Sequence, residues 1–362
     1  MIKRWMVFGV VVLMAILASV PVSFAGVDQS SSAAGPQTYT VVVGAEKAAR
    51  GIDLMAFFPG TLLIHVGDTV HWVANSTEFH TVTFLAGAPM PAFVVPAPAG
   101  AGSPVMVNPL AAFPTMPPKG LYNGATFVNS GLMGFAPGQA PEFNLTFTKT
   151  GTFAYVCVVH GQMMSGTIVV VAAGRAVPSP AQVAGIAHDQ MEKLWDQSEQ
   201  AIRDANHSIQ PATKNLDGTL THYVSIGYSV GQVDLMSFFP THLVVHPGDT
   251  IVWQLGSTNM SPHTVTFYNG NPDLSVITVK PQPNGPPLLL LNPAVLMPQQ
   301  PGQPLSRTGL FSSGFMDPMQ PGPKSYTLKI GDMSGLFEYD CILHDANGMT
   351  GTVFVATKHG GD

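Results

Sequence analysis

The chain has 362 residues, a length that accommodates about two domains of ordinary size. Only 10% of the residues are charged and 46% are hydrophobic, so enough apolar side chains are available for sizeable cores. The formal net charge of -6 argues against a nucleic-acid-binding protein, because binding to a phosphate backbone requires basic patches.

The first 25 residues have the pattern of a secretory signal peptide. Lys3 and Arg4 form a positively charged start, Met6 to Val20 is apolar, and small residues precede a cleavage point after Ala25. The apolar run is short for a membrane span of about 20 residues. We therefore predict cleavage and export to the periplasm, the extracellular space or the cell surface. An uncleaved membrane anchor is the alternative, and only in that case would the membrane be a partner.

Residues 26–37 are rich in Ser, Ala and Gly and are predicted to be a flexible leader. An internal repeat follows. Three segments of the first half return in the second: 52–59 as 233–240, 64–72 as 245–253 and 79–84 as 262–267. Short β-branched runs bounded by Gly-Asp and Pro turn signals predict strands, and Trp72 and Trp253 are predicted to be core residues. We therefore expect an all-β chain with one β-sandwich at 38–174 and another at 216–357.

Residues 175–215 link the two repeats and contain the one long predicted helix, at about 180–206. Ser179 is a suitable N-cap and Pro180 a suitable first helical residue. A helix of this length spans roughly 40 Å, enough to strap one domain to the other. A short tail, 358–362, ends the chain.

Each half also contains a long insertion rich in Pro, Met and Gly, at about 85–141 and 269–323. Loops of this length are often functional when they are ordered. Two interpretations stay open: ordered surface loops, or a cover or docking surface beside a functional site.

The two cysteines, Cys157 and Cys341, lie in matching stretches. Each is followed three residues later by a His, then by a Met, and then by x-Gly-Thr. A remote strand could supply a further His, because His80 and His263 begin the repeated His-Thr-Val-Thr-Phe segments. One thiolate, two imidazoles and a weak axial thioether suit copper in both oxidation states. A disulfide between the cysteines would leave the repeated His and Met spacing unexplained.

These motifs resemble those of the cupredoxins, the plastocyanin, amicyanin and azurin family of blue-copper proteins. The resemblance rests on Gly-Asp-Thr-Val-x-Trp, on His-Thr-Val-Thr-Phe and on the Cys-His-Met loops, and it covers most of 38–172 and 220–357. It implies two tandem cupredoxin-like Greek-key β-sandwiches joined by one linker helix, each with one blue (type 1) copper ion. The implied ligands are His80, Cys157, His160 and Met164 in the first half and His263, Cys341, His344 and Met349 in the second.

The axial ligand of the first site has two candidates. The loop from Cys157 to Met164 is one residue shorter than the loop from Cys341 to Met349, and Met163 competes with Met164. We favour Met164 because the segment Met-Ser-Gly-Thr that it begins parallels Met-Thr-Gly-Thr in the second half.

The resemblance implies a protein without enzymatic activity that carries single electrons between exported redox partner proteins, with His160 and His344 as the edges where electrons leave. Multicopper oxidases and copper nitrite reductases also combine such domains, but the His-x-His pairs and the His beside the Cys that mark them do not occur in this sequence.

Two alternatives remain. One is a copper-binding or delivery protein, since the insertions contain Met90, Met106, Met116, Met133, Met297, Met316 and Met319. The other is a copper oxidoreductase whose extra metal is assembled at an oligomer interface. Four further histidines could build an interdomain metal site, although exposed strand-end residues are the simpler interpretation; these are His65, His71, His242 and His246.

Overall fold

The computed structural model describes residues 35–134 and 141–357. The predicted signal peptide, residues 26–34 of the predicted leader and the tail from residue 358 lie outside the described residues. Within the described ranges, no helix combines the length and the apolar character needed to cross a bilayer.

The described chain is built mainly of strands in four sheets, which confirms the predicted all-β class. The largest sheet contains, in spatial order, β22 (Ser325–Lys329), β17 (Thr250–Leu255), β14 (Leu220–Val230), β15 (Val233–Phe239), β2 (Ile52–Phe58), β1 (Thr38–Lys47), β4 (Thr69–Ala74), β10 (Glu142–Phe147) and β8 (Leu121–Tyr122), with β13 (Thr213–Lys214) paired to β14.

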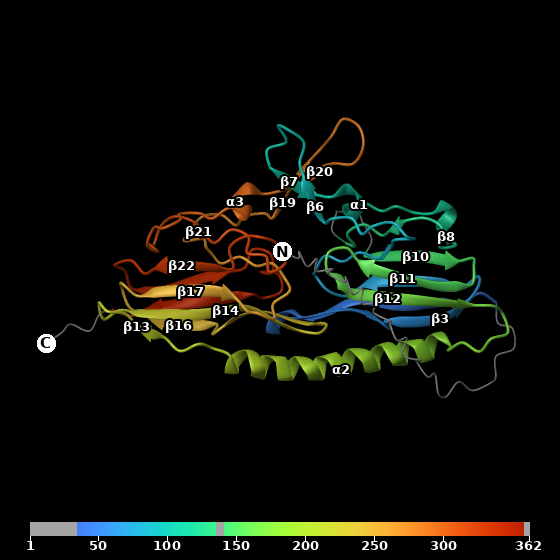
Figure 1. Cartoon of the computed structure of the whole chain (residues 1–362), viewed down its shortest axis with the longest axis horizontal. Coiled ribbons are helices and arrows are strands. Elements are labelled where there is room, and N and C mark those ends of the chain that lie inside the picture. Colours follow the sequence, from blue (N-terminus) through green and yellow to red (C-terminus); the bar gives the residue numbers. More distant parts are fainter. Residues whose placement is uncertain (1–34, 135–140, 358–362) are drawn as a thin grey trace, which may run out of the picture.

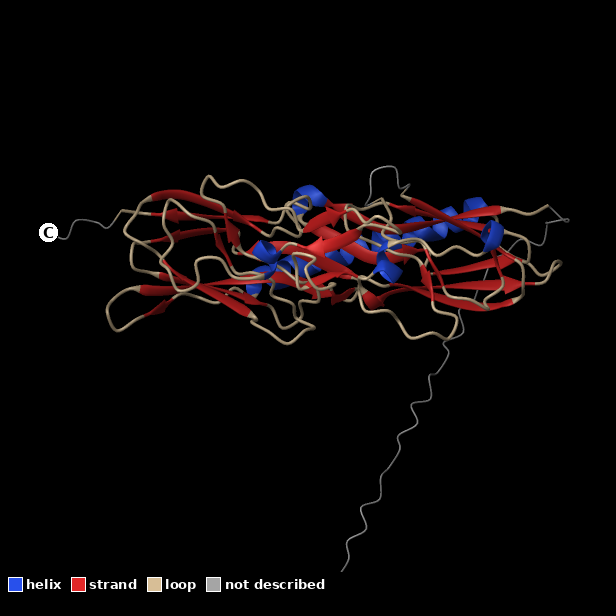
Figure 2. Ribbon diagram, turned by 90° about the horizontal axis from the view of Figure 1, so that it is seen from above, coloured by secondary structure: helices blue, strands red, loops and turns tan. Residues whose placement is uncertain are grey.

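A smaller sheet packs against each end of the large one. In the first half its order is β3 (Thr61–His65), β12 (Gly161–Val171), β11 (Gly151–Cys157), β5 (Thr83–Phe84) and β9 (Val128–Asn129). In the second half it is β16 (His242–Val245), β24 (Thr350–Val355), β23 (Gly335–Asp340), β18 (Thr266–Phe267) and β21 (Phe311–Ser312). The two sandwiches lie side by side in an elongated molecule (Figures 1 and 2).

Each sandwich has its own aromatic core. Trp72 and Trp253 are fully buried, and each lies 5.5 Å, centroid to centroid, from a tyrosine of the opposing sheet, Tyr155 or Tyr339. The Asp of each repeated Gly-Asp turn connects the ends of two strands by hydrogen bonds. The Asp68 carboxylate accepts hydrogen bonds from the amides of His65 and Gln37, and Asp249 repeats this with His246 and Leu220.

The two halves share a continuous sheet, which the sequence did not predict. Strands β2 and β15 pair antiparallel, with Asp53 opposite Asp234. Backbone bonds from Met55 to Gln232 (2.8 Å) and from Met236 to Gly51 (2.7 Å) extend this ladder. The linker helix is therefore not the only connection between the sandwiches.

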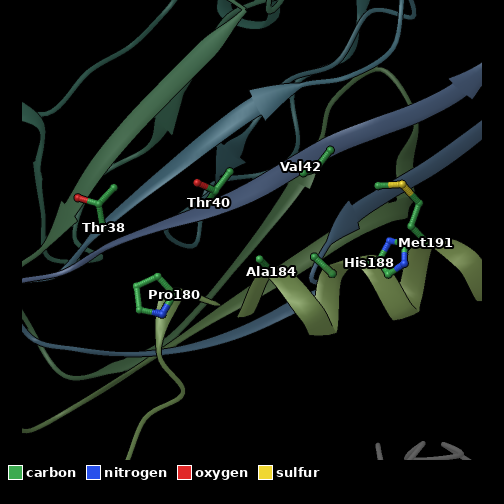
Figure 3. A pocket seen from close by; sticks show the side chains of 8 residues that line it. Thr38, Thr40, Val42, Pro180, Ala184, His188 and Met191 are labelled. Carbon is green, nitrogen blue, oxygen red and sulfur yellow. The ribbon is translucent and has the colours of Figure 1, made fainter. Parts of the chain in front are cut away.

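The long helix α2 (Pro180–His207) lies along this shared sheet and spans both halves (Figure 1). Ser179 and Gln182 form a capping box at its start. Its buried side chains, including Trp195 and Ala201, pack against apolar residues of β2 and β15. Figure 3 shows a groove between β1 and the first turns of α2, lined by Thr40, His188 and Met191 among others; none of its lining residues is a predicted metal ligand.

The two insertions meet each other above the junction. Their strands form the fourth sheet, in the order β19 (Ile277–Lys280), β20 (Leu288–Leu291), β7 (Val105–Val107) and β6 (Val94–Pro96). They also contain the short helices α1 (Pro109–Ala112) and α3 (Pro293–Leu296) and, in the first half, the 3-10 turn η2 (Pro118–Gly120). Leu290 pairs with Met106 across the two halves, and Val159, next to His160, packs into the same apolar cluster. The insertions therefore form a joint cover beside the predicted metal loops (Figure 1).

Candidate metal centres

Strand pairing brings the remote His of each half to its Cys. Cys157 ends β11, which pairs with β5, and His80 lies three residues before that strand. Cys341 follows β23, which pairs with β18, and His263 lies three residues before that strand. Neighbouring strands thus deliver a His and a Cys to the same end of each sandwich.

In the first half the ligand atoms of His80, Cys157 and His160 lie within 4.8 Å of one another. Cys157 Sγ is 3.5 Å from His160 Nδ1, and the two imidazole centroids are 5.0 Å apart. Nδ1 of His80 is buried and has no hydrogen-bond partner. A buried polar atom without a partner is costly, so this nitrogen is suited to a ligand that replaces the missing bond.

The second half repeats the arrangement with His263, Cys341 and His344. Cys341 Sγ is 3.7 Å from Nδ1 of His263 and 3.4 Å from Nδ1 of His344. Both Nδ1 atoms of the second half therefore face the sulfur, as Nδ1 of His160 does in the first half.

The opposite ring nitrogen of each remote His is held by a polar side chain four residues before it. Nε2 of His80 lies 2.8 Å from Ser76 Oγ, and Nε2 of His263 lies 3.3 Å from Asn259 Oδ1. Such partners fix the tautomer and the orientation of a metal-binding imidazole. The sequence motifs did not identify Ser76 and Asn259, although each lies four residues before a candidate ligand His.

Two equivalent glycines make room for these rings. Gly44 in β1 and Gly227 in β14 have φ values of +67° and +65°. A Cβ atom at either position would lie 2.5 Å from Nε2 of His80 or His263. Each sits at an irregularity in its strand pairing, a bulge that re-aims the backbone.

The threonines after the remote histidines hold the cysteines. The amide of Thr81 donates to Cys157 Sγ at 3.3 Å, and the amide of Thr264 donates to Cys341 Sγ at 3.3 Å. Their hydroxyls accept from the amides that follow each Cys. An amide aimed at sulfur stabilises the thiolate, which is the form that binds metal.

Met163 and Met164, the two candidate axial ligands of the first half, pack in different places. Met164 is fully buried in the core cluster that contains Cys157, and Met349 is fully buried with Cys341. Met163 is half-buried and packs against the core of the second half, and its carbonyl accepts from Gln232 Nε2 at 3.4 Å. Met163 therefore belongs to the junction, whereas Met164 belongs to the core cluster that contains Cys157.

Burial sets the protonation of these groups. It lowers the pKa of His80 and His263 well below the usual value, that of His160 to about 4 and that of His344 to about 3. Burial also raises the pKa of Cys157, and that of Cys341 to about 12. At neutral pH and without metal, the imidazoles are neutral and offer lone pairs, while the thiols keep their protons.

Neither His160 nor His344 lies at an open surface. Their side chains are only 8% and 6% exposed, and both Nε2 atoms face Glu78, at 4.0 Å and 3.7 Å. Burial, together with Asp234 and Glu46, raises the pKa of Glu78 to about 8. The ring edges that the resemblance implied as electron exits thus face Glu78, which lies between the two halves.

The four further histidines do not come together in one metal site. His65 bonds to the carbonyl of Arg175 and His71 to Glu142, while His242 bonds to Thr352. His246 lies beside Asp249 at 3.9 Å. Each has a separate partner, as expected for strand-end residues.

Residues 43–171 match the family of copper binding proteins called the plastocyanin/azurin family. Among solved structures, the chain is similar to an oxidised methionine-to-leucine mutant of amicyanin, at 22% identity over 37% of this chain and 81% of that one, with a TM-score of 0.22. It is also similar to the Cu(I) form of a methionine-to-alanine mutant of amicyanin, at 23% identity over 39% of this chain and 86% of that one, with a TM-score of 0.22.

The match to the plastocyanin/azurin family thus covers residues 43–171, a cupredoxin-like segment that contains His80, Cys157, His160 and Met164. The second half lies outside the matched residues, but it repeats the strands and the His and Cys arrangement of the first. The residues present fit copper, because a thiol, two imidazoles and a buried thioether in each half are the soft and borderline donors that this metal prefers.

Proposed function

We propose that this protein is an exported carrier of single electrons with two type 1 copper sites, one in each half. His80, Cys157, His160 and Met164 would hold the first ion, and His263, Cys341, His344 and Met349 the second. A copper ion held by this donor set supplies a one-electron Cu(I)/Cu(II) couple. The partners would be redox proteins outside the cytoplasm.

The observation that carries the proposal is the duplicated convergence of two imidazoles on a buried sulfur. In each half the strand pairing, the Thr amide on sulfur and the outer partner of the remote imidazole recur at equivalent positions. Rigid, buried ligands suit electron transfer, because little of the site has to move when the charge of the ion changes.

The test is metal analysis combined with visible absorption on the wild-type chain, on Cys157→Ser and on Cys341→Ser. We expect two copper ions per wild-type chain, one in each variant, and a strong thiolate-to-copper absorption band for each site. The proposal fails if the wild-type chain binds copper without that band, or if either variant still binds two ions.

A second candidate function, copper delivery, is favoured by one observation. The methionines Met90, Met116, Met297 and Met319 of the insertions are exposed, and thioethers bind Cu(I). Met90 also lies close to Gly161, directly after His160. If delivery is the function, replacing these four by Leu abolishes additional weak Cu(I) binding and leaves the two coloured sites intact.

A further inference from the structure

One carboxylate lies between the two candidate centres. Glu78 Oε2 is 4.0 Å from Nε2 of His160, and Glu78 Oε1 is 3.7 Å from Nε2 of His344. The Glu78 side chain is only 11% exposed. Each of its oxygens therefore faces an imidazole from a different half of the molecule.

The nitrogens that face Glu78 are the ones not directed at sulfur. Nδ1 of His160 and Nδ1 of His344 lie 3.5 Å and 3.4 Å from their cysteines. An imidazole that binds metal through Nδ1 carries its proton on Nε2, and it usually gives that proton to a carboxylate, a carbonyl or water. The remote histidines have their own partners in Ser76 and Asn259. Glu78 is placed to serve the other two.

The repeat shows that the sandwich itself does not require this carboxylate. Glu78 lies two residues before His80, and the equivalent residue two positions before His263 is Ser261. Ser261 instead donates to the Asp234 carboxylate. The duplicated fold therefore forms with a serine at this position, and the single Glu faces the rings of both halves.

The metal loops are also fixed across the junction. Asn347, between His344 and Met349, donates to Glu46 Oε2 at 3.0 Å and to Thr77 Oγ1 at 3.1 Å. A Cβ atom on Gly348 would lie 2.6 Å from the carbonyl oxygen of Ala48, so the second loop packs directly on the backbone of the first half. These contacts hold His344 opposite Glu78.

We propose that Glu78 is a positioning residue shared by the two metal centres. It accepts the Nε2 protons of His160 and His344, and it thereby keeps both rings with Nδ1 toward sulfur and couples the two loops across the junction. The present separations are 4.0 Å and 3.7 Å, and a direct hydrogen bond requires an approach of about 1 Å. The proposal rests on the proposed function for the metal, but the ring tautomers test it without any metal.

The first measurement uses the metal-free, full-length chain with 15N-labelled histidine. NMR assigns the tautomers of His160 and His344 in the wild type, in Glu78→Ser and in Glu78→Gln. Serine is the residue that the second half carries at this position, and glutamine keeps the shape if serine impairs folding. The spectra are recorded at pH 9, where Glu78 is ionised because its pKa is raised only to about 8. We expect Nε2–H at both rings in the wild type and a loss of this preference at both rings in Glu78→Ser. A change at one ring only, or at neither, overturns the proposal.

The second measurement is competition titration with Cu(I), with Cys157→Ser or Cys341→Ser added to isolate each site. Loss of an outer partner typically lowers metal affinity about 10–100-fold, and we expect a loss of this size at both sites in Glu78→Gln. Glu142→Gln is the matched control, because it removes an exposed carboxylate from His71 and is expected to change neither site. If the wild-type chain binds no copper, the proposed function fails, while the tautomers still decide the role of Glu78.

Discussion

Nδ1 of His263 and Nδ1 of His344 lie 3.0 Å apart, and both atoms are buried. Because burial lowers the pKa of both rings, both are neutral, and at most one of the two nitrogens can carry a proton toward the other. In the metal-free chain one ring can donate to the other across this distance, and a metal ion bound at the two nitrogens and the nearby sulfur would replace that proton.

Replacing Gly44 by Ala should empty the first centre and spare the second. The added Cβ would lie 2.5 Å from Nε2 of His80, so the ring must leave its place. We expect the copper content to fall from two ions per chain to one, with Gly227→Ala giving the reverse pattern.

The control for this pair is Gly231→Ala. Gly231 also has a positive φ, +59°, but an added Cβ has no neighbouring atom within 4 Å. It carries only the backbone cost of the left-handed conformation, about 1–2 kcal/mol, and should keep both ions. Retention of both ions by Gly44→Ala would contradict the site geometry.

Copper loading should release protons from the thiols. Burial raises the pKa of Cys157, and that of Cys341 to about 12, so both are protonated between pH 6 and 8. The imidazoles are neutral in this range and release none. We expect one proton per ion bound and an affinity that rises about tenfold per pH unit at each site.

Isothermal titration in buffers of different ionisation enthalpy measures this release. Cys341→Ser should release one proton per chain instead of two. Two protons per ion would mean that an imidazole is protonated before binding, and no release would mean that the thiolates already exist in the metal-free chain.

Met164→Leu should shift the reduction potential and the visible spectrum of the first centre only. Leucine fills a similar volume at a cost below about 1.5 kcal/mol, so the fold is kept while the thioether is lost. Met163→Leu is the control, because that side chain packs against the core of the second half. A shift caused by Met163→Leu and not by Met164→Leu would reverse the assignment.

Asp53→Asn should stabilise the metal-free protein at neutral pH. Both Asp53 oxygens are buried without a hydrogen-bond partner. Burial, followed by the charges of Glu78, Glu46 and Asp234, raises the pKa of Asp53 well above its usual value. The folded state therefore keeps a proton that the unfolded state releases, and stability is lost as pH rises from the unfolded pKa toward the folded one.

The asparagine variant does not lose stability in this way. The difference between its free energy of unfolding and that of the wild type should therefore grow with pH, by about 1.4 kcal/mol for each unit by which the pKa of Asp53 is raised. Urea unfolding at pH 5 and pH 8 measures it. Asp234→Asn is the matched comparison and should gain less, because the Asp234 carboxylate accepts hydrogen bonds from Ser229 and Ser261. An equal gain at both pH values would show that Asp53 is ionised.

The sequence by itself determined the repeat, the all-β class and the His and Cys residues that lie together in each half. These follow from local rules: period-two strands, Gly-Asp turns such as that of Asp68, and a Cys-His-Met spacing within a single loop. His80 lies far from Cys157 in the sequence, but it could be assigned because His263 occupies the equivalent position in the second half.

Only the tertiary structure decided how the halves are joined. The pairing of β2 with β15, and of Leu290 with Met106, depends on which exposed strand edges meet, and local patterning is the same for a free edge and a paired one. For the same reason no sequence motif marks Glu78. Its position between His160 and His344 exists only once the two sandwiches are packed together.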